Sequence, residues 1–271
     1  MSRDERIGPT AHYTAYAWHR LGLPYAEHFA TPRGRRLYWL FRGAGEWVAA
    51  ASGRSPLLVD VLAYRHRTID AEIARARPDV VVEIGAGLSP RGVWSVCDAG
   101  VERYVEVDLP HMVEAKRARL ATLPDEARRR CEARLALEAR DVLSDGFGAW
   151  LAGRLAGARR ALVNAEGVLG YFDVGERETI VRGVARGLRA AHEGTFLCDL
   201  RDRERAVQSG FAVSVLRGAV QVVTRGRGLR EDFADAGAVA SFFAGCGLHA
   251  SPVETPGERP MPTRIWRAAP A

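Results

Sequence analysis

Two glycines and one carboxylate are the residues of this chain best spaced for ligand chemistry. Gly85 and Gly87 directly follow the β-branched run at 80–84, and Asp108 ends a second such run, Tyr104-Val-Glu-Val-Asp108. The first run has the composition of a strand buried on both faces of a parallel sheet, and glycine lets the chain turn sharply beside a ligand. Strand, glycine turn, helix, strand and acid is the layout that holds a nucleoside by its ribose hydroxyls.

The residues around the glycines indicate which nucleoside this is. A dinucleotide fold needs a third small residue three positions after the second glycine, but Pro90 stands there and lacks an N–H group for a phosphate. Glu83 adds negative charge that would repel a pyrophosphate but would tolerate an amino group and a sulfonium. The residues therefore favour S-adenosylmethionine (SAM) over NAD, and the alternative is a glycine turn that binds no ligand.

Length and composition indicate one large α/β domain with additions, because the chain has 271 residues and 47% hydrophobic content. No apolar run reaches membrane-spanning length, and the charged first residues lack the apolar core of a secretory signal. The four cysteines, at positions 97, 131, 198 and 246, form no close pair in the sequence. We expect reduced cysteines in a cytoplasmic protein, with no membrane contact, disulfide framework or metal site.

The positive charge of the chain does not point to nucleic acid. The net charge is +6, but the 39 basic residues include a single lysine, Lys116, and the arginines alternate with acids, as in the segment 125–134. A nucleic-acid interface needs basic residues gathered on one surface, so we expect no nucleic-acid partner.

The segment before the glycine turn is rich in aromatic residues. His12, Tyr13, Tyr16 and His19 lie at helical spacings, and Thr10 could cap such a helix. One interpretation is a helical cap whose aromatic side chains are core anchors. The other is a lid over the active site with one face lining an aromatic substrate pocket. The same segment could also form a contact in a homodimer.

Hydrophobic periodicity predicts alternating helices and strands along the rest of the chain. We expect helices at 56–76, 92–99, 111–123, 147–156, 175–192 and 235–247. We expect strands at 80–84, 104–108, 132–138, 160–166, 195–200, 248–254 and 262–267, the last two as an antiparallel edge pair. The segment 201–229 suggests a hairpin or irregular cover over the site.

Three stretches and one lysine of the chain resemble the leucine carboxyl methyltransferase-like family: Val82–Leu88, Tyr104–Pro110, Asn164–Tyr171 and Lys116. The opening Gly8–Tyr16 resembles its bacterial tetracenomycin-type polyketide carboxyl O-methyltransferases. The resemblance implies a class I SAM-dependent methyltransferase fold, which is Rossmann-like with a seven-stranded, mostly parallel sheet. This domain would span 56–271, with an insertion at about 201–230, after an N-terminal helical cap at 1–55.

The resemblance also implies roles for individual residues. Arg65 would hold the methionine carboxylate, and the backbone at Gly85 and Gly87, after Glu83, would lie along the methionine part. Asp108, next to Leu109, would take the ribose hydroxyls. Asp141 and Val142 would meet the adenine, and Glu166 would face the amino group and the sulfonium. Asp141 could instead cap the next helix. The family usually has Asp where Ser89 stands. It also often has a larger apolar residue at Gly170, so the pocket beside Tyr171 would be roomier.

The methyl acceptor decides which other residues act. A carboxylate is ionised at neutral pH and needs no base, only donors that orient it, for which Tyr13, Tyr16, Arg201 and Arg203 are candidates. A phenol, with a pKa of about 10, profits from a base such as His12 or His19.

The sequence therefore predicts methyl-ester formation on a small aromatic or polyketide acid in natural-product biosynthesis, with S-adenosylhomocysteine (SAH) as the second product. A hydroxyl O-methyltransferase and a non-catalytic SAM-binding partner protein are the alternatives.

Overall fold

The computed structural model describes residues 8–42, 58–208, 233–254 and 261–271. The expected domain boundary at residue 55 and most of the expected insertion at 201–230 lie outside these residues, so both stay predictions.

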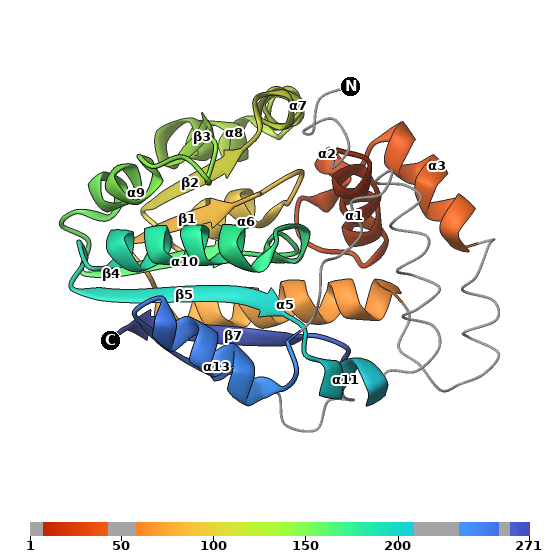
Figure 1. Cartoon of the computed structure of the whole chain (residues 1–271). Helices are drawn as coiled ribbons and strands as arrows, with labels where there is room; N and C mark the ends of the chain where they lie inside the picture. The colour runs from red at the N-terminus through yellow and green to blue at the C-terminus, as the bar shows by residue number, and fades with distance from the viewer. Residues whose placement is uncertain (1–7, 43–57, 209–232, 255–260) are drawn as a thin grey trace.

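The centre of the fold is a seven-stranded sheet in the order β3-β2-β1-β4-β5-β7-β6 (Figure 1). Its strands are β1 Val80–Ile84, β2 Arg103–Asp108, β3 Leu135–Ala139, β4 Arg160–Ala165, β5 Glu193–Leu200, β6 Leu248–Pro252 and β7 Arg264–Pro270. Strands β1 to β5 are parallel, and β7 runs antiparallel to both of its neighbours, β5 and β6. The predicted mostly parallel sheet with a reversed last strand is confirmed.

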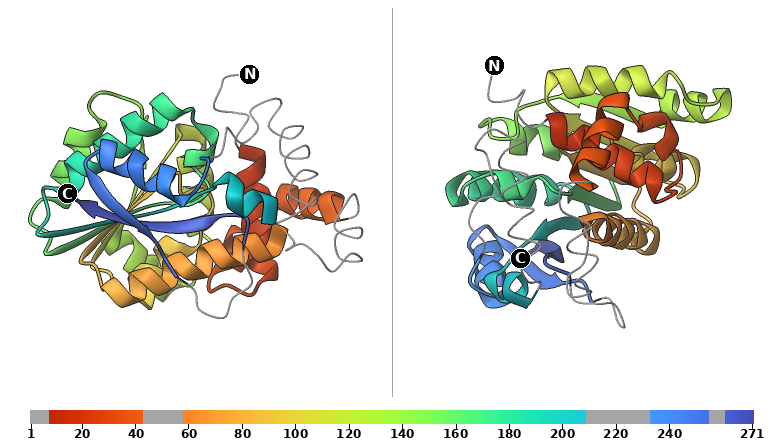
Figure 2. Two further views of the ribbon diagram at one scale, coloured as in Figure 1. Left: turned by 60° about the horizontal axis from the view of Figure 1, so that its bottom comes forward. Right: turned by 90° about the vertical axis from the view of Figure 1, so that its right-hand side faces the viewer.

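Helices cover both faces of the sheet. Apolar side chains of the central strands point to each face in turn, so both faces must be covered. Those on one face are α9 Phe147–Leu155, α10 Val174–Leu188 and α13 Ala236–Gly245, which pack with Val80, Val82 and Ile84 of β1 (Figure 2). The opposite face packs around Val81 and carries α5 Leu58–Ala76, α6 Arg91–Cys97, α7 Pro110–Leu120 and α8 Asp125–Arg134. The remaining short helices are η3 Leu169–Tyr171 and α11 Arg203–Gln208.

The N-terminal helices lie near the carboxyl ends of the parallel strands (Figure 1). They are α1 Gly8–Arg20, α2 Ala26–Phe29 and α3 Pro32–Phe41, and Thr31 caps α3 by accepting the Gly34 N–H at 2.9 Å. Trp18 and Phe29 join the same buried cluster as Ile69 of α5 and Met112 of α7. The described part of the expected cap is therefore packed into the core of the sheet domain.

The third predicted strand is wrong at its start. The alternating residues from 132 onward predicted a strand at 132–138, but the chain is helical through Arg134 and the strand begins at Leu135. Ala127 and Cys131, one helical turn apart, are buried against the sheet, and this tertiary contact outweighs the local alternation. Helix α8, which the sequence did not predict, is the result.

No helix in the described part of the chain is both long and apolar enough to span a membrane.

Candidate active site

The turn after β1 contains the two glycines and lies beside Asp108. Gly85 and Gly87 both have positive φ, 66° and 55°, a backbone region that suits glycine. A side chain at Gly85 would overlap a methyl group of Val168, and one at Gly87 would meet Ala11 of α1 at 3.3 Å. The turn thus sits tightly between the end of β4 and the first turn of α1.

Asp108 lies at the carboxyl end of β2 and is fixed by backbone donors. Its Oδ2 accepts the Gly87 N–H at 2.6 Å, and its Oδ1 accepts the Leu109 N–H at 2.7 Å. Burial raises the pKa of Asp108, while these two N–H groups oppose the rise. The carboxylate is therefore placed beside the glycine turn as the sequence predicts, and its role toward a ribose stays a prediction.

A fully buried arginine, Arg91, gathers three carboxylates from different parts of the chain. Its guanidinium donates to Asp70 at 2.6 Å, to Glu83 at 2.7 Å and to Glu166 at 2.7 Å. His66 Nδ1 lies 2.9 Å from the same guanidinium. Burial would lower the pKa of Arg91, but the carboxylates outweigh burial and raise it well above its ordinary value. The guanidinium is thus charged in the protein interior.

Glu83 belongs to this buried network. Besides Arg91, its carboxylate accepts from the Tyr104 hydroxyl at 2.9 Å and from the Asn164 amide at 3.1 Å. The side chain is 2% exposed, and its charge is paired with Arg91 inside the protein. A direct contact of Glu83 with a ligand stays a prediction.

Arg65 and Glu166 face each other at the end of β4. Arg65 Nε lies 3.4 Å from Glu166 Oε1, and each of these two buried atoms lacks a hydrogen-bond partner. Burial alone would raise the pKa of Glu166, but Arg91, His66 and Arg65 hold it well below its usual range. Arg65 remains charged, because Asp199 and Glu166 raise its pKa against the effect of burial.

The Arg65–Glu166 pair indicates whether SAM could bind at this site. An ionised Glu166 oxygen and a charged Arg65 nitrogen are buried without satisfied hydrogen bonds, and such atoms call for a partner. An α-amino acid zwitterion carries the two complementary charges. Together with Asp108 and the glycine turn, the residues present fit a ligand with a ribose and an amino-acid end.

The predicted adenine residues follow β3. Asp141 is exposed and accepts the Leu143 N–H at 2.9 Å, whereas Gly146 stands at the N-cap of α9. The alternative role of Asp141 as the cap of that helix is therefore wrong. Val142 packs partly buried against the core, and the adenine contact of both residues stays a prediction.

The N-terminal candidates lie between α1 and α3. Tyr13 is buried and stacks on Tyr38 with ring centroids 5.8 Å apart, and Tyr16 meets the same ring edge-on at 5.3 Å. His12 Nδ1 lies 3.1 Å from the Thr31 hydroxyl, and burial lowers the pKa of this histidine. These positions favour the core-anchor interpretation for the two tyrosines. A role of these three residues at the acceptor stays a prediction.

Two polar residues near the ends of β4 and β5 were not identified from the sequence as site candidates. Asp199, near the end of β5, accepts from Arg65 at 3.3 Å and from the Gly167 N–H at 2.5 Å. Tyr171 is directed at Thr10 of α1 with their hydroxyl oxygens 3.4 Å apart, and burial raises the pKa of Tyr171. Arg201, the predicted donor, follows β5 and influences that pKa. An acid near the end of a predicted strand, the signal that identified Asp108, would also have identified Asp199.

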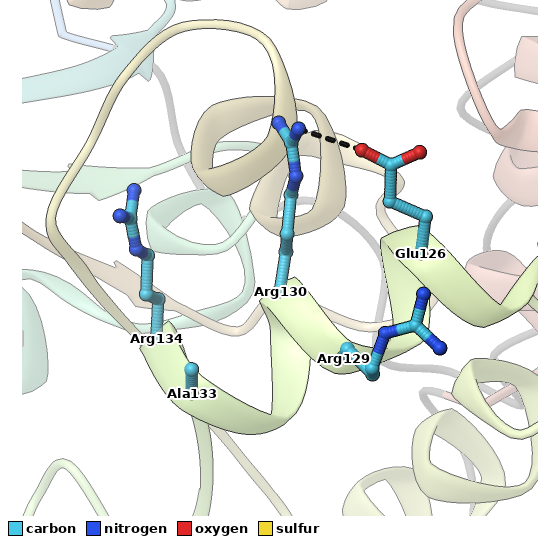
Figure 3. Close-up of a pocket in the computed structure, with 5 residues that line it drawn as sticks. All are labelled: Glu126, Arg129, Arg130, Ala133 and Arg134. Carbon is cyan, nitrogen blue, oxygen red and sulfur yellow. Dashed lines mark hydrogen bonds and ion pairs between the residues drawn. The ribbon is translucent and has the colours of Figure 1, made fainter.

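A separate surface concavity of about 580 Å³ lies along α8 (Figure 3). It is lined by Glu126, Arg129, Arg130, Ala133 and Arg134. Because α8 leads directly into the start of β3, its last turn lies toward the amino ends of the parallel strands. The concavity is therefore not part of the site described above.

The fold is shared with solved methyltransferases of low sequence identity. A protein assigned as an O-methyltransferase from Nostoc punctiforme matches with a TM-score of 0.52 and 17% identity over 78% of this chain and 57% of its own. An O-methyltransferase family protein from Burkholderia thailandensis matches with 0.53 and 15% identity over 76% and 56%. This chain thus spans little more than half of each of these two proteins.

Magnesium protoporphyrin IX methyltransferase from Synechocystis, solved with bound SAH, matches with a TM-score of 0.50 and 11% identity over 80% of this chain and 88% of its own. At these identities the likeness concerns the fold. The predicted class I methyltransferase fold is confirmed.

No curated protein matches the sequence. A family model described as leucine carboxyl methyltransferase matches residues 19–185, which is more than half of the chain. The likeness to the tetracenomycin-type branch stays a prediction, but the chain belongs to the leucine carboxyl methyltransferase family, as the sequence predicts.

Proposed function

We propose that the protein uses SAM to methylate a carboxylate of a small aromatic or polyketide-type acid, giving a methyl ester and SAH. Membership in a methyltransferase family and the class I fold support the SAM-dependent methyltransferase activity. The resemblance of Gly8–Tyr16 to polyketide carboxyl O-methyltransferases supports the choice of acceptor.

The observation that carries the cofactor proposal is the pair of oppositely charged groups beside the glycine turn. Arg65 and Glu166 each present a buried atom without a hydrogen bond, 3.4 Å apart. Arg65 would take the carboxylate of the methionine part and Glu166 its ammonium group, while Asp108 would accept from the ribose hydroxyls. When bound, SAM supplies a methyl group activated by its sulfonium.

Positioning is the main contribution that this chain makes to the reaction. A methyl transfer is an in-line displacement, so the acceptor oxygen must be held opposite the leaving sulfur. Tyr171 and Arg201 stand near the ends of β4 and β5, where a carboxylate acceptor would find a hydroxyl and a guanidinium as donors. Helix α1 lies against Gly87 and Tyr171 and would keep water from this edge of the sheet.

The placement of His12 also supports a carboxylate acceptor. A phenol acceptor profits from a general base, and that base must reach the proton it removes. His12 is engaged with Thr31 between α1 and α3. A carboxylate requires no such base, because it is already ionised at neutral pH. Hydroxyl methylation nevertheless remains the alternative, since His19 is exposed.

The chemical stability of the product tests this proposal. Hydroxynaphthoic acids offer both a carboxylate and a phenol, so the purified protein would be incubated with them and with SAM labelled in its methyl group. A methyl ester releases labelled methanol in mild alkali, whereas a methyl ether does not. We expect alkali-labile product, and alkali-stable product would favour the hydroxyl alternative. Binding of SAM without turnover on any acid would favour the non-catalytic alternative.

The partners follow from the same proposal. The protein would act on a free small molecule in the cytoplasm, with neither nucleic acid nor membrane as a partner. A homodimer stays a prediction, for which the exposed Trp39 and Leu40 of α3 are candidate contacts.

A further inference from the structure

The carboxylate of Asp199 accepts hydrogen bonds from helix α5, which carries Arg65, and from the turn after β4, which carries Glu166. Its Oδ2 accepts from Arg65 of α5 at 3.3 Å, and its Oδ1 accepts the N–H of Gly167, the residue after Glu166, at 2.5 Å. The side chain is 10% exposed and therefore acts in a weakly screened environment. Asp199 thus connects the arginine and the turn of the glutamate through one rigid group.

Arg65 and Glu166 form a loose ion pair in the protein interior. Arg65 Nε lies 3.4 Å from Glu166 Oε1, and neither of these two atoms makes a hydrogen bond. A charge-assisted hydrogen bond would be shorter, about 2.8 Å. Each of the two residues also has a second ion-pair partner: Glu166 pairs with Arg91 at 2.7 Å, and Arg65 pairs with Asp199 at 3.3 Å.

The orientation of Arg65 matters for a zwitterionic ligand. The contact with Glu166 includes no hydrogen bond between the facing atoms, so the direction of the guanidinium depends on its other partner. A guanidinium that already points at the ligand carboxylate needs no rearrangement on binding, so the ligand binds more tightly. The restraint on Glu166 comes from Arg91, which is buried in the network, and the restraint on Arg65 comes from Asp199.

We propose that Asp199 is a positioning residue that fixes the orientation of Arg65 beside Glu166 and so prepares the pair for the α-amino-acid end of SAM and SAH. The inference rests on the proposed use of SAM. It assigns to Asp199 an effect on one end of the ligand only, because its hydrogen bonds reach Arg65 and Gly167 and not the turn at Gly87 or Asp108.

The test compares two ligands that differ in the amino-acid end. SAH carries that end, whereas 5′-methylthioadenosine has the same adenosine and thioether without it. The affinity of each for the wild type and for Asp199→Asn would be measured by calorimetry. Asparagine keeps one carbonyl oxygen for the Gly167 N–H but loses the charge and the second oxygen that Arg65 needs. Glu72→Gln is the matched control, because Glu72 is also a buried acid bound to arginines, Arg75 and Arg267.

We expect Asp199→Asn to bind SAH on the order of tenfold to a hundredfold more weakly, the effect of losing one charged hydrogen bond, and to bind methylthioadenosine as the wild type does. We expect Glu72→Gln to change neither affinity. Unchanged SAH binding by Asp199→Asn would overturn the inference. An equal loss for both ligands would also overturn it, because the residue would then support the fold and not the ligand.

A double-mutant cycle supplies the second measurement. If Asp199 acts through Arg65, then Arg65→Gln with Asp199→Asn binds SAH no more weakly than Arg65→Gln alone. Additive losses would contradict this route. Failure of the proposed function has a different signature, since the wild type would then bind neither SAH nor methylthioadenosine.

Discussion

Replacement of Arg91 by methionine tests the buried network from which the site is built. Methionine is a flexible apolar residue of comparable length, so Arg91→Met removes the charge and keeps most of the volume. Three carboxylates lose their shared partner: Asp70, Glu83 and Glu166. Because the guanidinium is fully buried, water cannot take its place without opening the core.

The contacts that remain after this replacement limit the loss. Glu83 keeps Tyr104 and Asn164, and Glu166 keeps His66 at 3.3 Å. Asp70 is 21% exposed and regains hydration. The loss should therefore correspond to one broken buried ion pair, about 3–5 kcal/mol of the free energy of unfolding, and not to three.

Urea unfolding followed by circular dichroism measures this loss. With a slope of about 3 kcal/mol per molar urea, the transition midpoint should fall by about 1–2 M. The matched control is Arg128→Met on the exposed surface of α8, where the partners Asp125 and Glu132 stay hydrated and the midpoint should hardly move. The loss in Arg91→Met should shrink as the pH falls, because Arg91 holds the pKa of Glu166 low and this carboxylate can take up a proton once the arginine is gone. A loss below about 1 kcal/mol at neutral pH would show that Arg91 is not needed to hold these carboxylates in the core.

Three further perturbations test other parts of the account. Gly85→Ala should cost about 1–3 kcal/mol of unfolding free energy, and more than the control Gly100→Ala, because both have positive φ but only Gly85 lacks room for a side chain; equal thermal shifts would contradict this. Glu106 lies in β2 and pairs with Lys116 at 2.8 Å; burial outweighs this partner and raises the pKa of Glu106 to about 7, above the unfolded value of about 4.5. The folded state then binds the extra proton, and wild-type stability should decline between about pH 4.5 and 7 by at most about 3 kcal/mol relative to Glu106→Gln; a parallel pH dependence in urea titrations would refute it. Finally, His12→Ala and His19→Ala should each retain turnover on the acid acceptor within about tenfold, whereas a loss of about four decades at either would indicate a general base and a phenol acceptor.

The sheet was predictable because its signals are local. Strand β1 is a short β-branched run, β2 repeats valine at every second position, and the glycine or acid that ends each of them marks the edge where parallel strands bind ligands. Asp108 was identified in this way, and the structure places it beside Gly87. The start of β3 was not predictable, because the burial of Cys131 in the core, and not local alternation, decides where the preceding helix ends.

The buried network could not have been predicted, because its members are far apart in the sequence. Arg91 is one of many arginines in the chain, and nothing near it in the sequence shows that it is fully buried. Its partners come from α5, β1 and the end of β4, which only the fold brings together. The same holds for Asp199 and Arg65, whose contact joins residues 134 positions apart.

A crystal structure of the protein grown with SAH would show directly whether these residues hold the ligand. We expect the ribose hydroxyls on the carboxylate of Asp108, the amino-acid carboxylate on Arg65 and the ammonium group on Glu166. A complex whose ribose lies away from Asp108, or crystals that contain no ligand above Gly85 at saturating SAH, would contradict it.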